Sequence, residues 1–429
     1  MRGLGLFSAL ILIGACAQAA TVDELLADPA LERQVIDWRR YFHENPELSN
    51  REFNTAKRIT SELRAMGLQP KTGIAHTGIT ALLEGGKPGP LVALRADMDG
   101  LPVREMTDVP FRSKATGEYR GEEVPVMHAC GHDLHMAMLL GAARTLTEVR
   151  DELEGSVLFI FQPAEEGAPD GEEGGAELML KEGIFEPRKP DAVFGIHVFS
   201  TGPTGVIGYR AGPAMAAADT FRIVVRGKQT HGSRPWQGVD PIVVAGQIIT
   251  SAQTIVSRQT DIAKAPAVLS FGIVKGGVRN NIIPDEVELI GTIRNFDKGN
   301  QDAIHASLKT MATTIAEASG ATAEVTVDLG YPVTINDPAL TEQMLPTVRR
   351  VAGAQRVLEA PLVMGAEDFS YYANEVPGLF LYLGVTPPDR KLSTAPSNHS
   401  PLFYADEGSL MTGVGLLTHL TLDFMAQSQ

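Results

Sequence analysis

The hydrophobic pattern changes from helical to strand-like within the first hundred residues. Apolar positions recur at helical spacing through residues 22–67. This stretch ends at Gly67, a residue type that commonly follows a helix, and it predicts helical structure. Two short apolar runs follow, at residues 79–83 and 91–94, with a turn rich in glycine and proline between them. These runs predict short strands.

The same alternation continues further along the chain. Residues 136–149 predict a helix. Residues 157–161 and 192–196 are continuous apolar runs, as expected for strands that are buried on both faces. Strands that alternate with helices predict an α/β fold class, here a domain with a mainly parallel sheet.

A compact module interrupts this pattern. The expected elements are a strand at 221–226, a helix at 241–257, strands at 268–274 and 287–292, a helix at 301–319 and a strand at 323–327. That β-α-β-β-α-β order is the ferredoxin-like arrangement. The α/β pattern returns after it, so we expect residues 217–329 to be inserted between two parts of a larger domain, residues 20–216 and 330–429.

The N-terminus has the pattern of a targeting segment. Arg2 precedes an apolar run at residues 4–13, and small residues follow up to an A-x-A cleavage site at 17–19. This predicts that residues 1–19 are a signal peptide and that the protein is exported, to the periplasm or the medium. Alternatively, residues 13–16 resemble a lipobox, in which case Cys16 would be lipidated and would anchor the protein to a membrane.

Composition excludes some classes of partner. Apolar residues make up 44% of the 429 residues and charged residues 21%, which is ordinary for a globular protein. The formal net charge of −15 argues against binding to nucleic acid and against docking on anionic membranes.

Residues 128–135 read His-Ala-Cys-Gly-His-Asp-Leu-His. This octapeptide holds three of the ten histidines and one of the two cysteines. Thiolate and imidazole bind borderline-soft divalent metals well. The density of ligand types predicts a metallohydrolase.

Further candidate ligands stand where predicted strands end. Asp97 and Asp99 follow one strand at a spacing that would place both carboxylates on one side, and Glu165-Glu166 follow another. His197 ends a third strand, and His399 lies in a loop near the C-terminus. Taken singly, these signals are weak: the glutamate pair could be a solvated surface pair, His197 a hydrogen-bonded core histidine and Cys130 a buried apolar cysteine.

The combined motifs resemble a known family, the metal-dependent amidohydrolases that include hippurate hydrolase, plant indole-acetyl-amino-acid hydrolases and bacterial N-acyl-amino-acid amidohydrolases and carboxypeptidases. The matching segments are RADMDGLPV at 95–103, MHACGHDLHMAMLLGAA at 127–143, FQPAEEG at 161–167, GIHV at 195–198, THGSRPWQGVDPI at 230–242, GGVRNNIIPDEVELIGTIR at 276–294, MGAEDFSYY at 364–372 and NHSP at 398–401.

The resemblance implies a site with two divalent metal ions. Its ligands would be Cys130, His132, Glu166, His197 and His399. Glu165 would be the general base, and Asp99 would polarise a ligand. His231 would reach an active site, its own or that of a partner subunit, and the inserted module would mediate a homodimer. The metal could be zinc, manganese, cobalt or nickel.

Substrate recognition is left more open. A free carboxylate on an N-acyl amino acid or short peptide suits Asn281 and Arg294, although Asn281 could serve a turn and Arg294 a surface pair. Gly365 lies in a loop that could line the acyl pocket. A hinge near Gly212 and Tyr331 would close the two domains over the site.

Two rival functions remain at this point. Cys130 could be a nucleophile with a neighbouring histidine as base, which would make the protein a thiol hydrolase that survives chelation. The chain could instead be an exported solute-binding lipoprotein without catalysis, whose function would survive replacement of Glu165 by glutamine.

Overall fold

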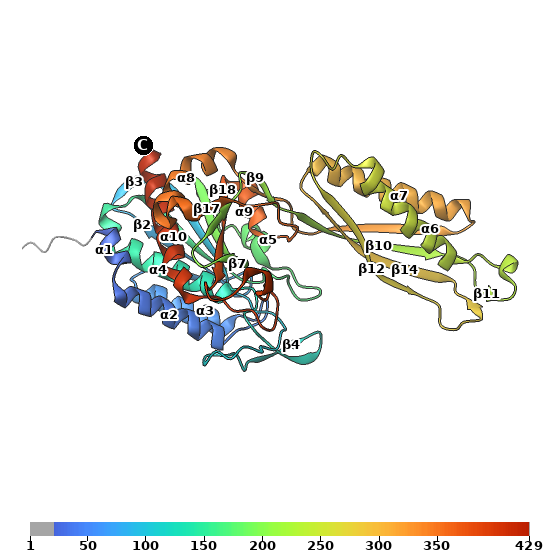
Figure 1. Ribbon diagram of the computed structural model, residues 1–429, viewed down its shortest axis with the longest axis horizontal. Coiled ribbons are helices and arrows are strands. Elements are labelled where there is room, and N and C mark those ends of the chain that lie inside the picture. Colours follow the sequence, from blue (N-terminus) through green and yellow to red (C-terminus); the bar gives the residue numbers. More distant parts are fainter. Residues whose placement is uncertain (1–20, 429) are drawn as a thin grey trace, which may run out of the picture.

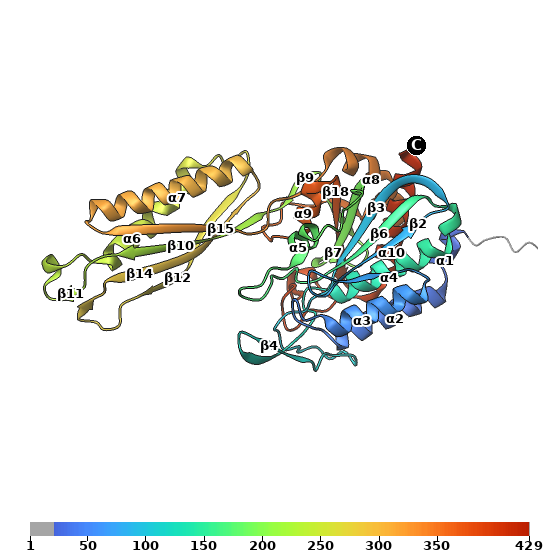
Figure 2. The same cartoon turned by 180° about the vertical axis from the view of Figure 1, so that it is seen from behind.

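The computed structural model describes residues 21–428. Figures 1 and 2 show a larger part built on a central sheet and an elongated smaller part, joined by two linkers. The predicted signal peptide and the alternative lipidation site at Cys16 lie outside the described residues. Within the part of the chain that is described, no helix combines the length and apolar character needed to cross a membrane.

The large part is organised on an eight-stranded sheet. Its strand order is β1 (Lys71–Ile74), β2 (Gly78–Glu84), β6 (Glu154–Gln162), β3 (Lys87–Asp97), β7 (Ala192–Pro203), β18 (Gly378–Thr386), β8 (Ile207–Tyr209) and β17 (Val357–Glu359). The central strands β6, β3, β7 and β18 run parallel. The predicted α/β class with a mainly parallel sheet is therefore confirmed.

Alternation along the strands divides the core into two layers. In β3, Val92 and Leu94 face one core and Leu91 and Ala93 the other. The first core is covered by α1 (Val22–Leu26), α2 (Pro29–Glu44), α3 (Phe53–Ala65), α4 (His132–Glu148), α8 (Pro338–Ala352) and α10 (Leu410–Gln427). The second is covered by α5 (Gly175–Lys181) and α9 (Phe369–Glu375).

The inserted module has the predicted topology. Its antiparallel sheet runs β12 (Ala267–Gly276), β14 (Glu286–Asn295), β10 (Ala217–Arg226) and β15 (Thr322–Leu329), with α6 (Pro241–Thr254) and α7 (Lys298–Ala318) on one face. Phe221, Ile223 and Val225 alternate toward these helices and form a separate core. A role of the module as a lid or dimerisation domain stays a prediction.

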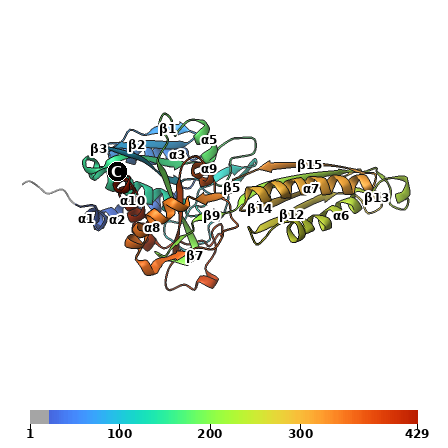
Figure 3. The ribbon, with the colours of Figure 1, turned by 90° about the horizontal axis from the view of Figure 1, so that it is seen from above.

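Short strand pairs mark the ends of both parts. They are β4 (Thr116–Tyr119) with β5 (Glu122–Pro125), β9 (Gly212–Met215) with β16 (Thr334–Asn336), and β11 (Thr230–His231) with β13 (Ile282–Ile283). The β9–β16 pair lies where the linkers leave the large part, whereas β11 and β13 lie at the far end of the inserted module (Figures 1 and 3).

Some sequence-based boundaries were wrong. The helix expected at residues 136–149 begins at His132 and ends at Glu148, so two candidate histidines stand on the helix itself. The helical stretch at 22–67 is divided into three helices, and α6 ends at Thr254 and passes into a π-helical turn. Strand β18, which is buried at every position, had not been predicted.

Candidate functional site

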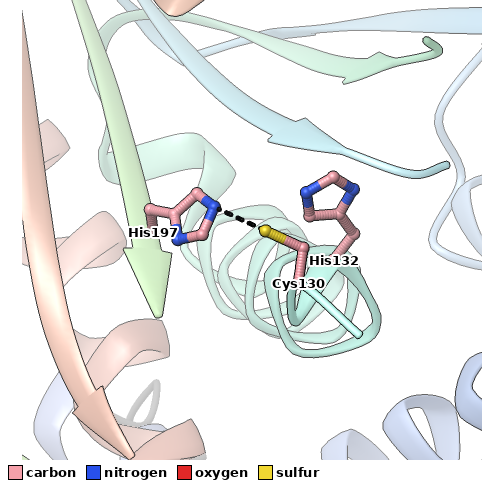
Figure 4. Close-up of side chains that lie close together, drawn as sticks. All are labelled: Cys130, His132 and His197. Atoms are coloured by element: carbon pink, nitrogen blue, oxygen red, sulfur yellow. Dashed lines mark hydrogen bonds between the residues drawn. The ribbon is translucent and has the colours of Figure 1, made fainter. Parts of the chain in front are cut away.

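The carboxyl ends of the parallel strands bring the predicted site residues to one edge of the sheet. β3 ends at Asp97, β6 ends three residues before Glu165, and β7 carries His197. The N-terminus of α4 meets this edge and supplies Cys130 and His132 (Figure 4). Open α/β sheets place their sites at this edge because the loops that follow parallel strands meet there.

A glycine makes the sharp entry into α4. Gly131 is in the left-handed region, with φ 104°. A Cβ on this residue would lie 2.2 Å from Cγ2 of Val198, a distance that side chains do not tolerate. The turn therefore requires glycine, and it sets Cys130 and His132 on the same side of the helix start, facing His197 (Figure 4).

The five predicted metal ligands lie together. Sγ of Cys130 is 3.4 Å from Nε2 of His197 and 3.2 Å from Nε2 of His399. Oε1 of Glu166 is 3.1 Å from Nε2 of His399 and 3.9 Å from Nε2 of His132. Ligand atoms around one tetrahedral zinc ion lie roughly 3.3–3.8 Å apart. The four distances lie in this range or within about 0.2 Å of it, so small side-chain shifts would bring the atoms to the spacing of a metal site.

Buried polar atoms support the same conclusion. Nε2 of His132 is buried and has no hydrogen-bond partner, and the buried Oε1 of Glu166 has only its 3.1 Å ion-pair contact with Nε2 of His399. A buried polar group without a partner costs about 1–3 kcal/mol. Both atoms point into the ligand cluster, where a divalent cation would satisfy them, so the residues fit the metal ions that the sequence predicts.

Asp99 fixes the geometry around the two glutamates. Its carboxylate accepts hydrogen bonds from the backbone N–H of Glu165 (3.1 Å) and of Glu166 (3.0 Å) and from Oγ of Ser49 (2.7 Å). Its Oδ1 also lies 3.2 Å from Nδ1 of His132. Asp99 thus holds Nδ1 of His132 and leaves Nε2 facing the ligand cluster.

The cluster is strongly acidic. Although burial opposes the charge, the carboxylates of Asp97 and Asp99 raise the pKa of His132 to about 10. Burial, followed by repulsion from Glu367 and Glu166, raises the pKa of Glu165 well above its ordinary value. Such an excess of negative charge favours cations at this position.

The structure adds a buried network that the sequence analysis missed. Asp97 had been paired with Asp99 by spacing and given no role. Its Oδ1 lies 2.6 Å from Nδ1 of His135, and its Oδ2 accepts from Nη1 of Arg95 at 2.8 Å. Oδ2 of Asp97 also lies 3.8 Å from Nε2 of His132, so Asp97 and Asp99 approach opposite nitrogens of that ring. The sequence did carry a sign of this network, because Arg95 and Asp97 are charged residues within an otherwise apolar stretch of a strand.

The remaining predicted residues do not join the cluster. His231 and Asn281 lie side by side at the exposed far end of the inserted module, where the backbone N–H of Gly232 donates to the carbonyl of Asn281 at 2.8 Å. Arg294 is half-buried at the opposite end, paired in register with Ala218. His231 therefore does not reach the metal cluster of its own chain in this arrangement.

Gly365 lies beside a linker. Its carbonyl accepts from the backbone N–H of Ala216 at 3.1 Å, directly before β10 begins. This places Gly365 at the junction of the two parts of the molecule, close to the buried network of Glu367 and Arg95.

A mainly parallel sheet with a Cys/His/Glu cluster at its carboxyl edge defines a metallohydrolase. The chain belongs to Peptidase family M20/M25/M40, whose profile matches residues 93–423. Its members act on amide bonds, and this protein is a metal-dependent hydrolase of that kind.

Individual relatives resemble it along almost the whole chain. It is 41% identical over 394 residues to thermostable carboxypeptidase 2 of Saccharolobus solfataricus, covering 91% of this chain and 95% of that one. It is 38% identical to IAA-amino acid hydrolase ILR1-like 2 of Arabidopsis thaliana, covering 94% and 88%. Among solved structures, the YXEP protein of Bacillus subtilis, described as a dinuclear metal-binding peptidase of the M20 family, matches with a TM-score of 0.78 and 34% identity over 94% of this chain and 100% of that one.

Proposed function

We propose that this protein hydrolyses the amide bond of N-acyl amino acids or short peptides, with two divalent metal ions and Glu165 as the general base. The observation that carries the proposal is the convergence of five ligand side chains, with the buried Nε2 of His132 left without a hydrogen-bond partner, next to a second buried carboxylate. The names of the relatives, a carboxypeptidase and an IAA-amino acid hydrolase, support this class of substrate.

The chain divides the work between two adjacent glutamates. Glu166 directs Oε1 toward His399 and His132 and would hold metal with them, together with Cys130 and His197. When bound, divalent metals acidify the attacking water and polarise the scissile carbonyl. Zinc, manganese, cobalt or nickel would suit this donor set.

Glu165 is placed to move the proton. Its Oε2 lies 3.7 Å from Nε2 of His132, next to the ligand cluster, and the resemblance of the motifs gives it the role of base rather than of ligand. It would take a proton from the attacking water and deliver it to the departing amine nitrogen. The Asp99 bonds to both backbone N–H groups fix the two side chains in their different directions.

A cleft of about 730 Å³ begins at the metal cluster and gives the substrate room. Its lining is mixed: the apolar groups include Leu101, Pro102 and Tyr119, and the polar and charged side chains include Ser49, Arg51, Glu118, Arg120, Glu166 and Asp170. Pockets of this size commonly hold small ligands.

The inserted module would complete the site from a second copy. We propose a homodimer in which His231 and Asn281 reach the partner's site, because both are exposed at the far end of the module and distant from their own cluster (Figure 3). His231 would stabilise the developing oxyanion, and Asn281 or Arg294 would bind the substrate carboxylate.

The decisive experiment compares wild type with Glu165→Gln for metal content and for hydrolysis of a panel of N-acyl amino acids. Both proteins should hold metal, and only the wild type should turn over, with a loss of about 10²–10⁴ in the variant. Equal turnover would remove Glu165 as the base. Metal-free protein that still hydrolyses would restore the thiol-hydrolase alternative, and absence of turnover on every substrate would favour a binding protein.

We also propose that the protein is exported, on the pattern of residues 1–19. Fractionation of cells and the mass of the mature N-terminus test this. A chain that begins at residue 20 supports cleavage of a simple signal peptide. A lipid-modified Cys16 supports the lipoprotein alternative, and an intact N-terminus contradicts both.

A further inference from the structure

The turn that carries Glu165 depends on anchors from outside it. Ala164 has φ 52°, in the left-handed region that disfavours alanine. Its backbone N–H donates to Oε1 of Glu52 at 3.0 Å, and that of Glu165 donates to Asp99 at 3.1 Å. The carbonyl of Glu165 accepts from the hydroxyl of Tyr331 at 2.7 Å. Two anchors, Glu52 and Asp99, thus come from the body of the large domain, and the third comes from a linker to the inserted module.

Tyr331 belongs to the linker that returns from the inserted module, between β15 and β16. Its own carbonyl accepts from the backbone N–H of Ala218 at 3.0 Å, and Ala218 lies in β10, which continues the outgoing linker. A Cβ on Gly330 would lie 2.1 Å from the carbonyl oxygen of Ala218. The two linkers are therefore in direct backbone contact, and Tyr331 must move when they move.

The Tyr331 hydroxyl can donate its hydrogen bond to the Glu165 carbonyl at any pH at which the protein is folded, because it stays protonated. Burial, followed by repulsion from Asp368 and Glu165, raises the pKa of Tyr331, so the hydroxyl keeps its proton. The ring packs edge-on against Tyr371, with the ring centroids 6.2 Å apart. The hydroxyl of Tyr371 instead reaches the carbonyl of Gly330, at 3.5 Å, and does not bond to the Glu165 turn.

We propose that Tyr331 is a positioning residue that couples the orientation of the inserted module to the placement of Glu165. The proposal rests on the general-base role of Glu165 given above. Rotation of the module moves the joined linkers and with them the hydroxyl that holds the Glu165 carbonyl. The base is then held in place only in module orientations that keep this hydrogen bond.

Tyr331→Phe tests the contact, with Tyr371→Phe as the matched control. Losing one neutral hydrogen bond should lower kcat about three- to tenfold in Tyr331→Phe. KM, metal content and Tm should stay close to wild type, because no ligand and little apolar contact is lost. Hydrogen exchange at the backbone N–H groups of residues 164–167 should also become faster. Tyr371→Phe loses only the long bond to the Gly330 carbonyl and keeps the bond between Tyr331 and Glu165, so it should change kcat and the exchange rates much less than Tyr331→Phe does.

A double-mutant cycle shows whether the effect passes through Glu165. In a Glu165→Ala background, Tyr331→Phe should lower the residual turnover by less than twofold. Gly330→Ala retains the Tyr331 hydroxyl group but separates the linkers and so displaces it, and should therefore lower kcat as Tyr331→Phe does.

Three results would overturn the positioning role: an unchanged kcat and exchange rate in Tyr331→Phe, an equal loss of turnover in the Glu165→Ala background, or an unchanged kcat in a folded Gly330→Ala protein. Wild-type protein that hydrolyses none of the amides would instead refute the proposed function, while the exchange measurement would still decide the contact. The two failures are therefore distinguishable.

Discussion

Replacing Arg95 with methionine should destabilise the large domain severely. The Arg95 side chain is 1% exposed and lies within 2.9 Å of carboxylate oxygens of Asp97, Glu367 and Asp368. Its Nε also donates to Gln162 at 2.8 Å. Methionine fills similar space but leaves the three carboxylates without their cation. Removing one partner of a buried ion pair costs about 3–5 kcal/mol.

An exposed arginine provides the control. Arg226 bridges Glu286 (3.1 Å) and Glu324 (2.9 Å) on the inserted module, with its side chain 49% exposed. Ion pairs of this kind contribute about 0–1 kcal/mol. Arg226→Met should therefore change stability little, although it too removes an arginine from between two carboxylates.

Tryptophan fluorescence during urea unfolding measures the difference. The chain has two tryptophans: Trp38 is 1% exposed in the large domain, and Trp236 is 77% exposed on the module. The signal thus follows the large domain. With a slope of about 3 kcal/mol/M, the midpoint of Arg95→Met should fall by roughly 1–2 M. A midpoint within about 0.3 M of wild type would refute the view that the guanidinium compensates this cluster.

The loss of stability in Arg95→Met relative to wild type should also depend on pH. Burial raises the pKa of Glu367 to about 8, and Arg95 opposes that rise. Without Arg95, the carboxyl should hold its proton more strongly in the folded state than in the unfolded chain. A group with a raised folded pKa loses stability as pH rises toward that value. Wild type stops losing stability near pH 8, whereas Arg95→Met continues to lose it up to its own, higher pKa. The difference in midpoint between the two proteins should therefore grow above about pH 8, and a difference that stays constant through that range would contradict this cause.

Three other outcomes follow from the geometry of the site. Gly131→Ala should lower metal content and turnover together, measured by elemental analysis and amide hydrolysis, because its Cβ would lie 2.2 Å from Val198. Cys130→Ser should lose metal during dialysis at a rate at least tenfold higher than wild type, since a hydroxyl is a poorer ligand than a thiolate. Equal retention of metal in the two proteins would argue against a thiolate ligand. Removing metal from the wild type with a chelator should lower Tm by several degrees, and adding metal back should restore it, because the buried carboxylates need a cation. A Tm that does not change on chelation would contradict metal binding at this cluster.

Local patterns carried much of the fold and supplied the candidate site residues, while the resemblance to a known family supplied the choice of ligands among them. Apolar runs and helical periodicity depend on neighbours in the chain, and they predicted the parallel sheet and the ferredoxin-like order of the module. Strand ends followed by acids and imidazoles predicted which side chains would meet. Strand β18 was not identified, since a short apolar run alone does not distinguish a buried strand from a helical segment.

Only the tertiary structure decided which charges neutralise one another. Arg95 meets Asp368 across 273 positions of sequence, and Tyr331 meets the carbonyl of Glu165 across 166. It also placed β11, the strand that carries His231, far from the cluster of its own chain (Figure 1). The physical reason is that hydrophobic periodicity shows only which side of one segment is buried. Contacts between distant segments depend on how sheets, helices and linkers pack together, and that packing is settled only in the folded chain.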